Sequence, residues 1–482
     1  MEDKKTITGS GAAGEKENTA EATSEGKENT AVKEENRMGV MPVKKLLFSM
    51  SAPMVASMLF QAFYNIVDSV IVAMISQDAL NAVSLAFPMQ MLCIAFATGT
   101  GVGMCALISR YLGAKKTKDV DRTANTGIFL YLMTALAFLL IGLAFPEAYY
   151  RLQTSNETII RYGKDYLTVC LCISVSLFGQ MCFERLLQAT GRTDLAMIPQ
   201  IVGAVINMIL DPIMVLGLLG FPRMEVLGAA VATVIGQTVA AILGLILNLK
   251  KNPEIRLDFK LIRPHGKTVA RIYDIGLPSI VMQAIGSVMN FGMNKILIGF
   301  TEAATAVFGA YYKIQSFIFM PIFGINNAYI PIMSYNFGAR RPDRVHETRK
   351  LTTIVSIAIM TAGTLAFELI PAQLLGLFSP GEEMLKVGVT AFRVIGIHFP
   401  IAGFCIIAGS TCQALGKPKY SLYVSLIRQL AVLLPAAYLL SLTGKLDLVW
   451  LSFPIAEIAS LIVSTIFLKR TLNVLNTMET EV

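Results

Sequence analysis

The sequence SRYLGAKK at residues 109–116 returns as SYNFGARR at residues 334–341, in the same register and 225 positions later. A glycine, an alanine and two basic residues keep their places in both copies. The same offset joins further matches: Ala52-Pro53 with Leu277-Pro278, Asn65 with Asn290, Phe145-Pro146 with Ile370-Pro371, Gly163 with Gly388, and residues 188–192 with residues 413–417. One offset held over so much of the chain predicts an internal duplication.

Long apolar runs separated by short polar loops surround these matches. A helix needs about 20 apolar residues to cross the hydrocarbon core, and runs of this length without alternation are not barrel strands. The predicted spans are 46–75, 82–109, 124–145, 165–190, 195–219, 227–249, 272–300, 305–333, 351–370, 389–414, 421–441 and 449–468. We therefore predict an all-α polytopic membrane protein with 12 transmembrane helices in two six-helix lobes. Because each copy holds an even number of spans, the repeats are parallel and related by a pseudo-two-fold axis along the membrane normal.

Composition and charge agree with a membrane location. Only 15% of the 482 residues are charged and 54% are hydrophobic, whereas soluble domains are about 25% charged. With a cytoplasmic N-terminus, the inner loops carry 24 Lys and Arg residues and the outer loops carry six. This bias predicts a multi-pass protein of the plasma (inner) membrane with both termini cytoplasmic. It also explains the net charge of +8 without nucleic acid as a partner.

The ends of the chain differ from its apolar body. Residues 1–40 are mostly polar and predict a disordered cytoplasmic tail. The N-terminal lobe is then expected at 41–255, the C-terminal lobe at 256–470 and a short cytoplasmic tail at 471–482.

Two carboxylates lie well inside spans of the first lobe. Asp68 and Asp211 fall at similar depths on helices that run in the same direction, and Asn207 and Thr233 fall near that level. An acid in a membrane span costs about 2.5–3.5 kcal/mol, so each is a functional candidate. If they converge, the pair needs a proton or a cation, and these oxygen ligands suit sodium. The alternative is that each acid is separate and satisfied by local hydrogen bonds.

The first span carries further polar residues on the same face as Asp68. Gln61, Tyr64 and Asn65 precede the acid at the spacing of helix turns. Such a face is unfavourable against lipid and is expected to point toward the protein interior.

These motifs together resemble a known family. The sequences YNIVDS at 64–69, NMILDP at 207–212 and GAAVAT at 228–233 resemble the multidrug and toxic compound extrusion (MATE) family, and the resemblance runs from about residue 40 to 470. It implies an antiporter that exports organic cations and other drugs against inflowing sodium or protons. It also implies two lobes in a V shape around a central cavity. The coupling site would be Asp68, Asn207, Asp211 and Thr233, with Na⁺ as a candidate ion there.

The chain departs from a branch of the family that places acids in the second lobe. Gly286 stands where that branch has an acid, and span 389–414 offers Arg393 and His398 instead. A single coupling site, in the first lobe, is therefore expected. The neutral polar residues of span 272–300 are candidates for the substrate cavity or for helix–helix hydrogen bonds. The candidate cavity residues are Gln61, Tyr64, Asn65, Gln283, Ser287, Asn290 and Asn294.

Other charged residues in the spans support weaker interpretations. Glu184, Arg185 and Arg428 are predicted to form ion pairs within their lobes, and Glu457 is predicted to form an ion pair or to bind cationic cargo. Lys313 either faces the cavity or pairs with an acid.

Two alternative functions differ from drug export. A flippase for lipid-linked precursors would need several basic residues in the cavity to bind its anionic cargo. The spans offer mainly Lys313 and Arg428, against deep acids at Asp68, Asp211 and Glu457. A membrane enzyme is disfavoured because the three histidines form no catalytic or metal-binding constellation. No cofactor beyond the coupling ion and no obligate protein partner are expected.

Overall fold

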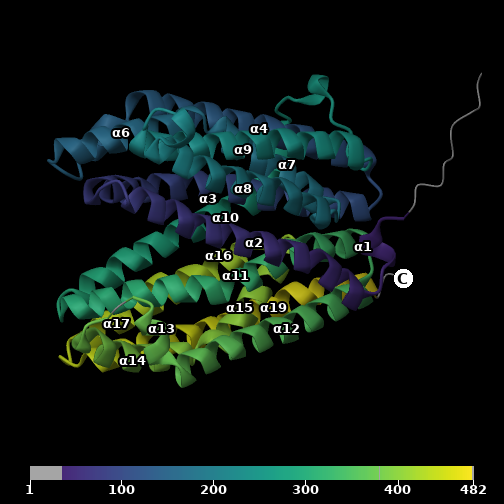
Figure 1. Cartoon of the computed structure of the whole chain (residues 1–482). Helices are drawn as coiled ribbons and strands as arrows, with labels where there is room; N and C mark the ends of the chain where they lie inside the picture. Colours follow the sequence, from purple (N-terminus) through teal and green to yellow (C-terminus); the bar gives the residue numbers. More distant parts are fainter. Residues whose placement is uncertain (1–34, 379, 480–482) are drawn as a thin grey trace, which may run out of the picture. The chain divides into compact units, whose positions relative to one another are not determined.

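The computed structural model describes residues 35–378 and 380–479, and within them the secondary structure is helical with no strand. The helices of the first half are α1 (Arg37–Val40), α2 (Val43–Ala73), α3 (Gln77–Gly113), α4 (Thr117–Ala144), α5 (Pro146–Arg151), α6 (Glu157–Cys172), α7 (Val175–Ala189), α8 (Thr193–Leu216) and α9 (Glu225–Lys251). The helices of the second half are α10 (Gly266–Leu297), α11 (Glu302–Gly338), α12 (Pro342–Leu369), α13 (Pro371–Gly376), α14 (Glu382–Gly396), α15 (Phe399–Ala414), α16 (Pro418–Leu426), α17 (Leu434–Ser441), α18 (Leu446–Val449) and α19 (Ser452–Glu479). A π-helical segment, Ile427–Leu433, joins α16 to α17. The helices form two bundles, each with its own apolar core (Figure 1).

The duplication is visible in local structure. Helices α3 and α11 begin and end 225 residues apart, as do α4 and α12. Ser76 caps α3 by accepting from the backbone N of Ala79 at 3.0 Å, and Thr301 caps α11 by accepting from that of Ala304 at 3.1 Å. Both hydroxyls satisfy an amide that the helix start leaves free. The repeated motif therefore specifies the same helix boundaries twice.

The same correspondence holds for buried contacts inside each bundle. Ser109 Oγ donates to the carbonyl of Ala189 at 2.7 Å, and Ser334 Oγ donates to the carbonyl of Ala414 at 3.2 Å. Each bond ties the end of one long helix to the end of another helix of the same lobe. Conservation of the bond across the offset confirms the predicted parallel repeat.

Two of the predicted spans are broken. In the described residues, ten helices are long and apolar enough to cross a membrane, and the bent pairs α6–α7 and α14–α15 bring the spans to twelve. The pairs bend by 44° and 46°. At the second break, Pro400 lies in the first turn of α15 and has no amide hydrogen to continue the ladder from α14. The spans predicted at 165–190 and 389–414 are thus two helices each.

The lobes meet through close backbone approaches. Helix α3 of the first lobe packs against α10 and α11 of the second, and α2 packs against α11. A Cβ atom on Gly276 would lie 2.6 Å from the carbonyl oxygen of Gly99. Glycine is required at this crossing because any side chain would separate α3 from α10.

The ends of the described part of the chain differ from the predicted tails. Residues 1–34 lie outside the described residues. Residues 36–40 do not behave as a disordered tail, because Met38 is fully buried and α1 is hydrogen-bonded to both lobes. At the other end, α19 continues to Glu479 rather than ending near residue 470. Several helices also extend past the predicted apolar spans, because charged residues at their ends continue the helices.

Candidate functional site

The two predicted acids of the first lobe come together. Asp68 projects from α2 and Asp211 from α8, and their carboxyl groups lie within hydrogen-bonding reach of each other. Asp211 is fully buried, while Asp68 is half-buried. Two carboxylates this close and shielded from water cannot both stay ionised without a compensating proton or cation.

Asn207 and Thr233 complete this cluster. The carboxamide of Asn207 fits its neighbours when its nitrogen donates to Asp211 Oδ2 at 3.2 Å. Its oxygen then accepts from the hydroxyl and the backbone N of Thr233, both at 3.1 Å. The predicted convergence of the four residues on α2, α8 and α9 is therefore seen in the structure, whereas their role in coupling stays a prediction.

The cluster has free oxygen atoms suited to a small cation. Oδ1 of Asp68 and Oδ1 of Asp211 are buried and have no hydrogen-bond partner among the described residues. With the neutral oxygens of Asn207 and Thr233, they form a set that fits a proton or Na⁺. Within residues 35–378 and 380–479, no three or more His, Cys, Asp or Glu side chains are grouped as the ligands of a metal.

Two aromatic residues flank the acids. The phenol of Tyr64 lies in electrostatic range of both carboxyl groups, and the phenol of Tyr166 lies in range of Asp68. Gln90 donates to the Tyr166 oxygen at 2.9 Å. Sequence analysis did not identify Tyr166 or Gln90, because they lie on helices α6 and α3, where no motif marks them.

A cavity of about 640 Å³ lies between the lobes. Many of its lining positions occur in pairs related by the repeat, such as Met58 with Gln283 and Gln188 with Gln413. The cavity therefore lies on the pseudo-two-fold axis. Asn207 and Thr233 also line it, so the acid cluster and the cavity share a wall.

The predicted cavity residues divide into two groups. Gln61, Tyr64 and Gln283 line the cavity. Outside the lining lie Asn65, Ser287, Asn290 and Asn294. The prediction fails for these four because helical spacing does not specify how far along each helix the cavity extends. Ser287 and Asn294 are two turns apart on an exposed face of α10, toward the end away from the cavity.

The charges in the second lobe pair as predicted. Arg428 Nη1 lies 3.3 Å from Glu457 Oε2, and the Glu457 side chain is 3% exposed. Arg428 belongs to the π-helical segment, an irregularity often found at functional sites, and it lines the cavity. Lys313 lies outside the lining, with its ammonium over the ring of Phe378.

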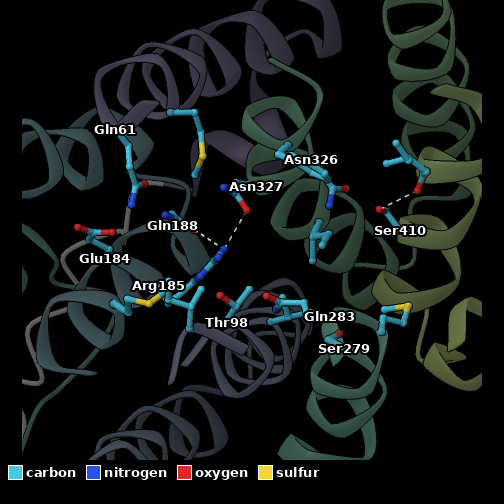
Figure 2. Close-up of a pocket in the computed structure, with 18 of the residues that line it drawn as sticks. Gln61, Thr98, Glu184, Arg185, Gln188, Ser279, Gln283, Asn326, Asn327 and Ser410 are labelled. Atoms are coloured by element: carbon cyan, nitrogen blue, oxygen red, sulfur yellow. Dashed lines mark hydrogen bonds between the residues drawn. The ribbon is translucent and has the colours of Figure 1, made fainter. Parts of the chain in front are cut away.

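The ion pairs predicted for Glu184 and Arg185 within the first lobe do not form among the described residues, where both side chains bond to neutral amides. Glu184 accepts from Gln180 at 2.9 Å, whereas Arg185 Nη1 donates to Gln188 at 2.9 Å and to Asn327 at 3.1 Å. Adjacent residues on a helix point in different directions and do not face each other. The bond to Asn327 crosses from α7 of the first lobe to α11 of the second (Figure 2).

Up to twelve spans in two repeated lobes of the described chain, with a cavity on the axis between them, are the architecture of a membrane transporter. A family model described as MatE matches residues 53–213 and again residues 278–439. The chain therefore belongs to the MATE family of transporters, which are not enzymes.

Known relatives cover most of both chains. The multidrug export protein MepA of Staphylococcus haemolyticus is 27% identical over 423 residues, which cover 86% of this chain and 90% of that protein. An FAD transporter of Shewanella oneidensis is 25% identical over 418 residues, covering 86% and 92%. A solved multidrug resistance MATE transporter in an outward-facing conformation superposes with a TM-score of 0.86 at 24% identity, covering 92% of this chain and 99% of that one.

Proposed function

We propose that this transporter exports small organic molecules across the plasma membrane in exchange for protons that enter through the Asp68–Asp211 pair. The observation that carries the proposal is the approach of these two carboxyl groups beside the central cavity. At hydrogen-bonding distance, a shared proton is the simplest way to remove the repulsion between them. Sodium is the alternative ion, since the surrounding oxygens also suit it.

The helix packing supports a route from the pair to the lobe interface. Asp68 lies on α2, which packs against α8 of its own lobe and against α11 of the other lobe. Loss of the shared proton makes the two acids repel and favours a different packing of α2 on α8. Because α2 also contacts α11, such a shift alters how the lobes meet, which is what alternating access requires.

The nature of the cargo follows less directly from these acids. Asp68 and Asp211 do not line the cavity, and Glu457 is engaged by Arg428. They therefore do not support the expectation of a cationic cargo. The named relatives include multidrug exporters and an FAD transporter, which agrees with cargo in the size range of drugs. A cavity of about 640 Å³ suits such molecules.

The membrane orientation is part of the proposal. The excess of Lys and Arg in the loops at the Gly113 and Gly338 ends of α3 and α11 supports a cytoplasmic position for that end and for both termini.

Reconstituted vesicles test the coupling. We would measure efflux of anionic, neutral and cationic dyes under an imposed proton or sodium gradient, for wild type, Asp68→Asn and Asp211→Asn. Loss of proton-driven efflux in both variants is the expected result. Asp165→Asn, which changes an exposed acid on α6, is the matched control and should retain it. Efflux driven only by a sodium gradient would mean that sodium, and not the proton, is the coupling ion. Gradient-driven efflux that persists in Asp68→Asn would show that the Asp68–Asp211 pair is not the coupling site.

The flippase remains the alternative function. The arginines of the cavity are the feature that a phosphate-bearing lipid would use, but Arg428 already has a carboxylate partner. Translocation of a fluorescent polyprenyl pyrophosphate in the same vesicles, with no movement of any soluble dye, would favour it.

A further inference from the structure

We propose that Arg185 is an anion-binding residue of the central cavity, and that the cargo is an organic molecule carrying a carboxylate, phosphate or sulfonate group. This inference rests on the proposed function, since it takes the cavity as the place where cargo binds.

Arg185 is a buried cation that has no direct ion-pair partner in the part of the chain that the structure describes. Its exposed fraction is 8%, and its side chain contributes to the cavity wall. Both hydrogen-bond partners, Gln188 and Asn327, offer neutral amide oxygens. Among the described residues, no carboxylate forms a salt bridge with it. A buried charge is unfavourable without an opposite charge, so the site is suited to one supplied from outside.

Glu184 does not fill that role. It lines the same cavity, but its Oε1 accepts from Gln180 on its own helix. Its position next to Arg185 in the chain turns the two side chains apart on α7. Glu184 thus lies in electrostatic range of the guanidinium but forms no direct ion pair with it among the described residues.

The guanidinium keeps donors for a ligand. Nη1 makes both hydrogen bonds, whereas Nε and Nη2 have no partner among the described residues and are not enclosed by protein. Two N–H groups on one edge of a guanidinium match the two oxygens of a carboxylate or phosphate. The arrangement therefore presents a bidentate site toward the cavity.

A glycine on α3 holds the Arg185 stem in place. A Cβ atom on Gly101 would lie 2.8 Å from Cγ of Arg185 and 2.7 Å from the hydroxyl of Tyr131. The aliphatic part of the arginine therefore lies directly against the α3 backbone. This contact limits where the guanidinium can move and keeps its head at the cavity.

The site is specific to one lobe. The repeat places Ser410 at the position equivalent to Arg185, and both line the cavity. The other arginine of the lining, Arg428, has its own carboxylate in Glu457. Amides and hydroxyls near the guanidinium, including Thr98 and Gln283, can bind the polar edge of a ligand (Figure 2). Methionine and phenylalanine in the wall suit an apolar ring.

Equilibrium binding to the full chain in nanodiscs tests this proposal separately from transport. Three fluorescent probes share one ring system and differ in charge: 7-methoxycoumarin-4-acetate, its primary amide, and its 2-(trimethylammonio)ethyl amide. We expect the acetate to bind at least about tenfold more tightly than the amide, as for a hydrogen bond between charged groups. Arg185→Gln should remove this preference and leave the affinity for the amide unchanged.

Two further variants separate charge from folding. Arg185→Lys keeps the positive charge but loses the two parallel N–H groups of the guanidinium. It should therefore retain only part of the preference for the acetate probe over the amide. Arg161→Gln removes an exposed arginine of α6 outside the cavity and should retain all of it. An equal affinity of the wild type for acetate and amide, or a tighter binding of the ammonium probe, would overturn the proposal.

Competition distinguishes a soluble anion from a lipid headgroup. Displacement of the acetate probe by free benzoate supports a soluble cargo, whereas displacement only by a polyprenyl phosphate in the bilayer would overturn that part of the proposal. Anion binding without dye efflux in vesicles would contradict the export function and leave the anion site standing.

Discussion

Gly113 at the end of α3 and Gly338 at the end of α11 approach each other's helices reciprocally. A Cβ atom on Gly113 would overlap the carbonyl oxygen of Tyr335, and one on Gly338 would overlap that of Arg110. The two glycines are 225 residues apart and occupy equivalent places in the repeat. One contact related by pseudo-symmetry thus joins the lobes at the end where both long helices stop.

Gly338→Val should open this contact. A valine side chain cannot fit against the Arg110 carbonyl, so the lobes must separate at this end. Spin labels at Lys118 and Asp343, exposed and equivalent by the repeat, report the separation by pulsed electron resonance. We expect the mean distance to rise by several ångströms and dye efflux to slow.

Gly309→Val provides the control for this change. Gly309 lies within α11, and a Cβ atom there would meet nothing within 4 Å. Gly309→Val therefore changes only the local helix propensity, so the distance between the two spin labels should match that of wild type. An unchanged distance in Gly338→Val as well would show that the contact does not hold the lobes.

Thr233→Val distinguishes the coupling ions. Its hydroxyl donates to Asn207, and among the described residues it has no hydrogen bond to either carboxyl group of the pair. A proton needs only the carboxyl oxygens, so proton-driven efflux should fall by less than about tenfold, as for the loss of one neutral hydrogen bond. A sodium site that loses an oxygen ligand or an outer partner weakens by about 10–100-fold. Initial efflux rates measured against ion concentration distinguish the two ions. A large rise in the half-saturating ion concentration of Thr233→Val would contradict coupling by protons.

Much of this architecture could be predicted from the sequence. The repeat offset predicts the matching ends of α3 and α11, because the same cap and the same glycine occur in both copies. Depth along the helices predicts that Asp68 meets Asp211, since both lie at similar distances from the same helix ends. These features are predictable because each depends only on where a residue lies along its helix or within one copy of the repeat.

What the sequence could not predict depends on contacts between lobes. Arg185 was expected to pair within its lobe, but it reaches Asn327 across the interface. Ser287 and Asn294 lie on α10 beyond the residues that line the cavity, and helical periodicity does not specify how far along a helix the cavity extends. The bend near residue 173 is also a tertiary feature, since apolar composition continues through it, whereas Pro400 marks the bend near residue 397 in the sequence.

Gly101→Ala tests how Arg185 is positioned. The added methyl group would lie 2.8 Å from Cγ of Arg185, so the side chain must shift while its charge is kept. We expect the preference for 7-methoxycoumarin-4-acetate over its amide to fall by about tenfold, because a bidentate contact depends on orientation. Gly286→Ala, whose Cβ would have no neighbour closer than 3.8 Å, is the matched control. If both variants show the same preference for the acetate over the amide, the α3 backbone at Gly101 does not position Arg185.

Met38 gives the last prediction, which concerns stability. Its side chain is fully buried, with Leu46, Ile332 and Tyr335 in the same cluster. Its carbonyl accepts from Asn336 and Arg344 of the second lobe, while the neighbouring Arg37 donates to Gly191 of the first. Met38→Ala should therefore lower the free energy of unfolding by about 2–5 kcal/mol, the usual range for a buried methionine.

Thermal unfolding of the full chain in detergent measures this effect. Val40→Ala, two residues further along α1, is the control, because Val40 is 53% exposed and its truncation should shift the midpoint little. Equal shifts for the two variants would mean that residues 36–40 do not fasten the lobes and that the burial of Met38 contributes nothing to stability. Met38→Ala should also be made in a protein in which Arg37 and Arg344 are already Ala. If it no longer shifts the midpoint there, packing and hydrogen bonding at this segment act as one unit, since coupled contacts are not additive.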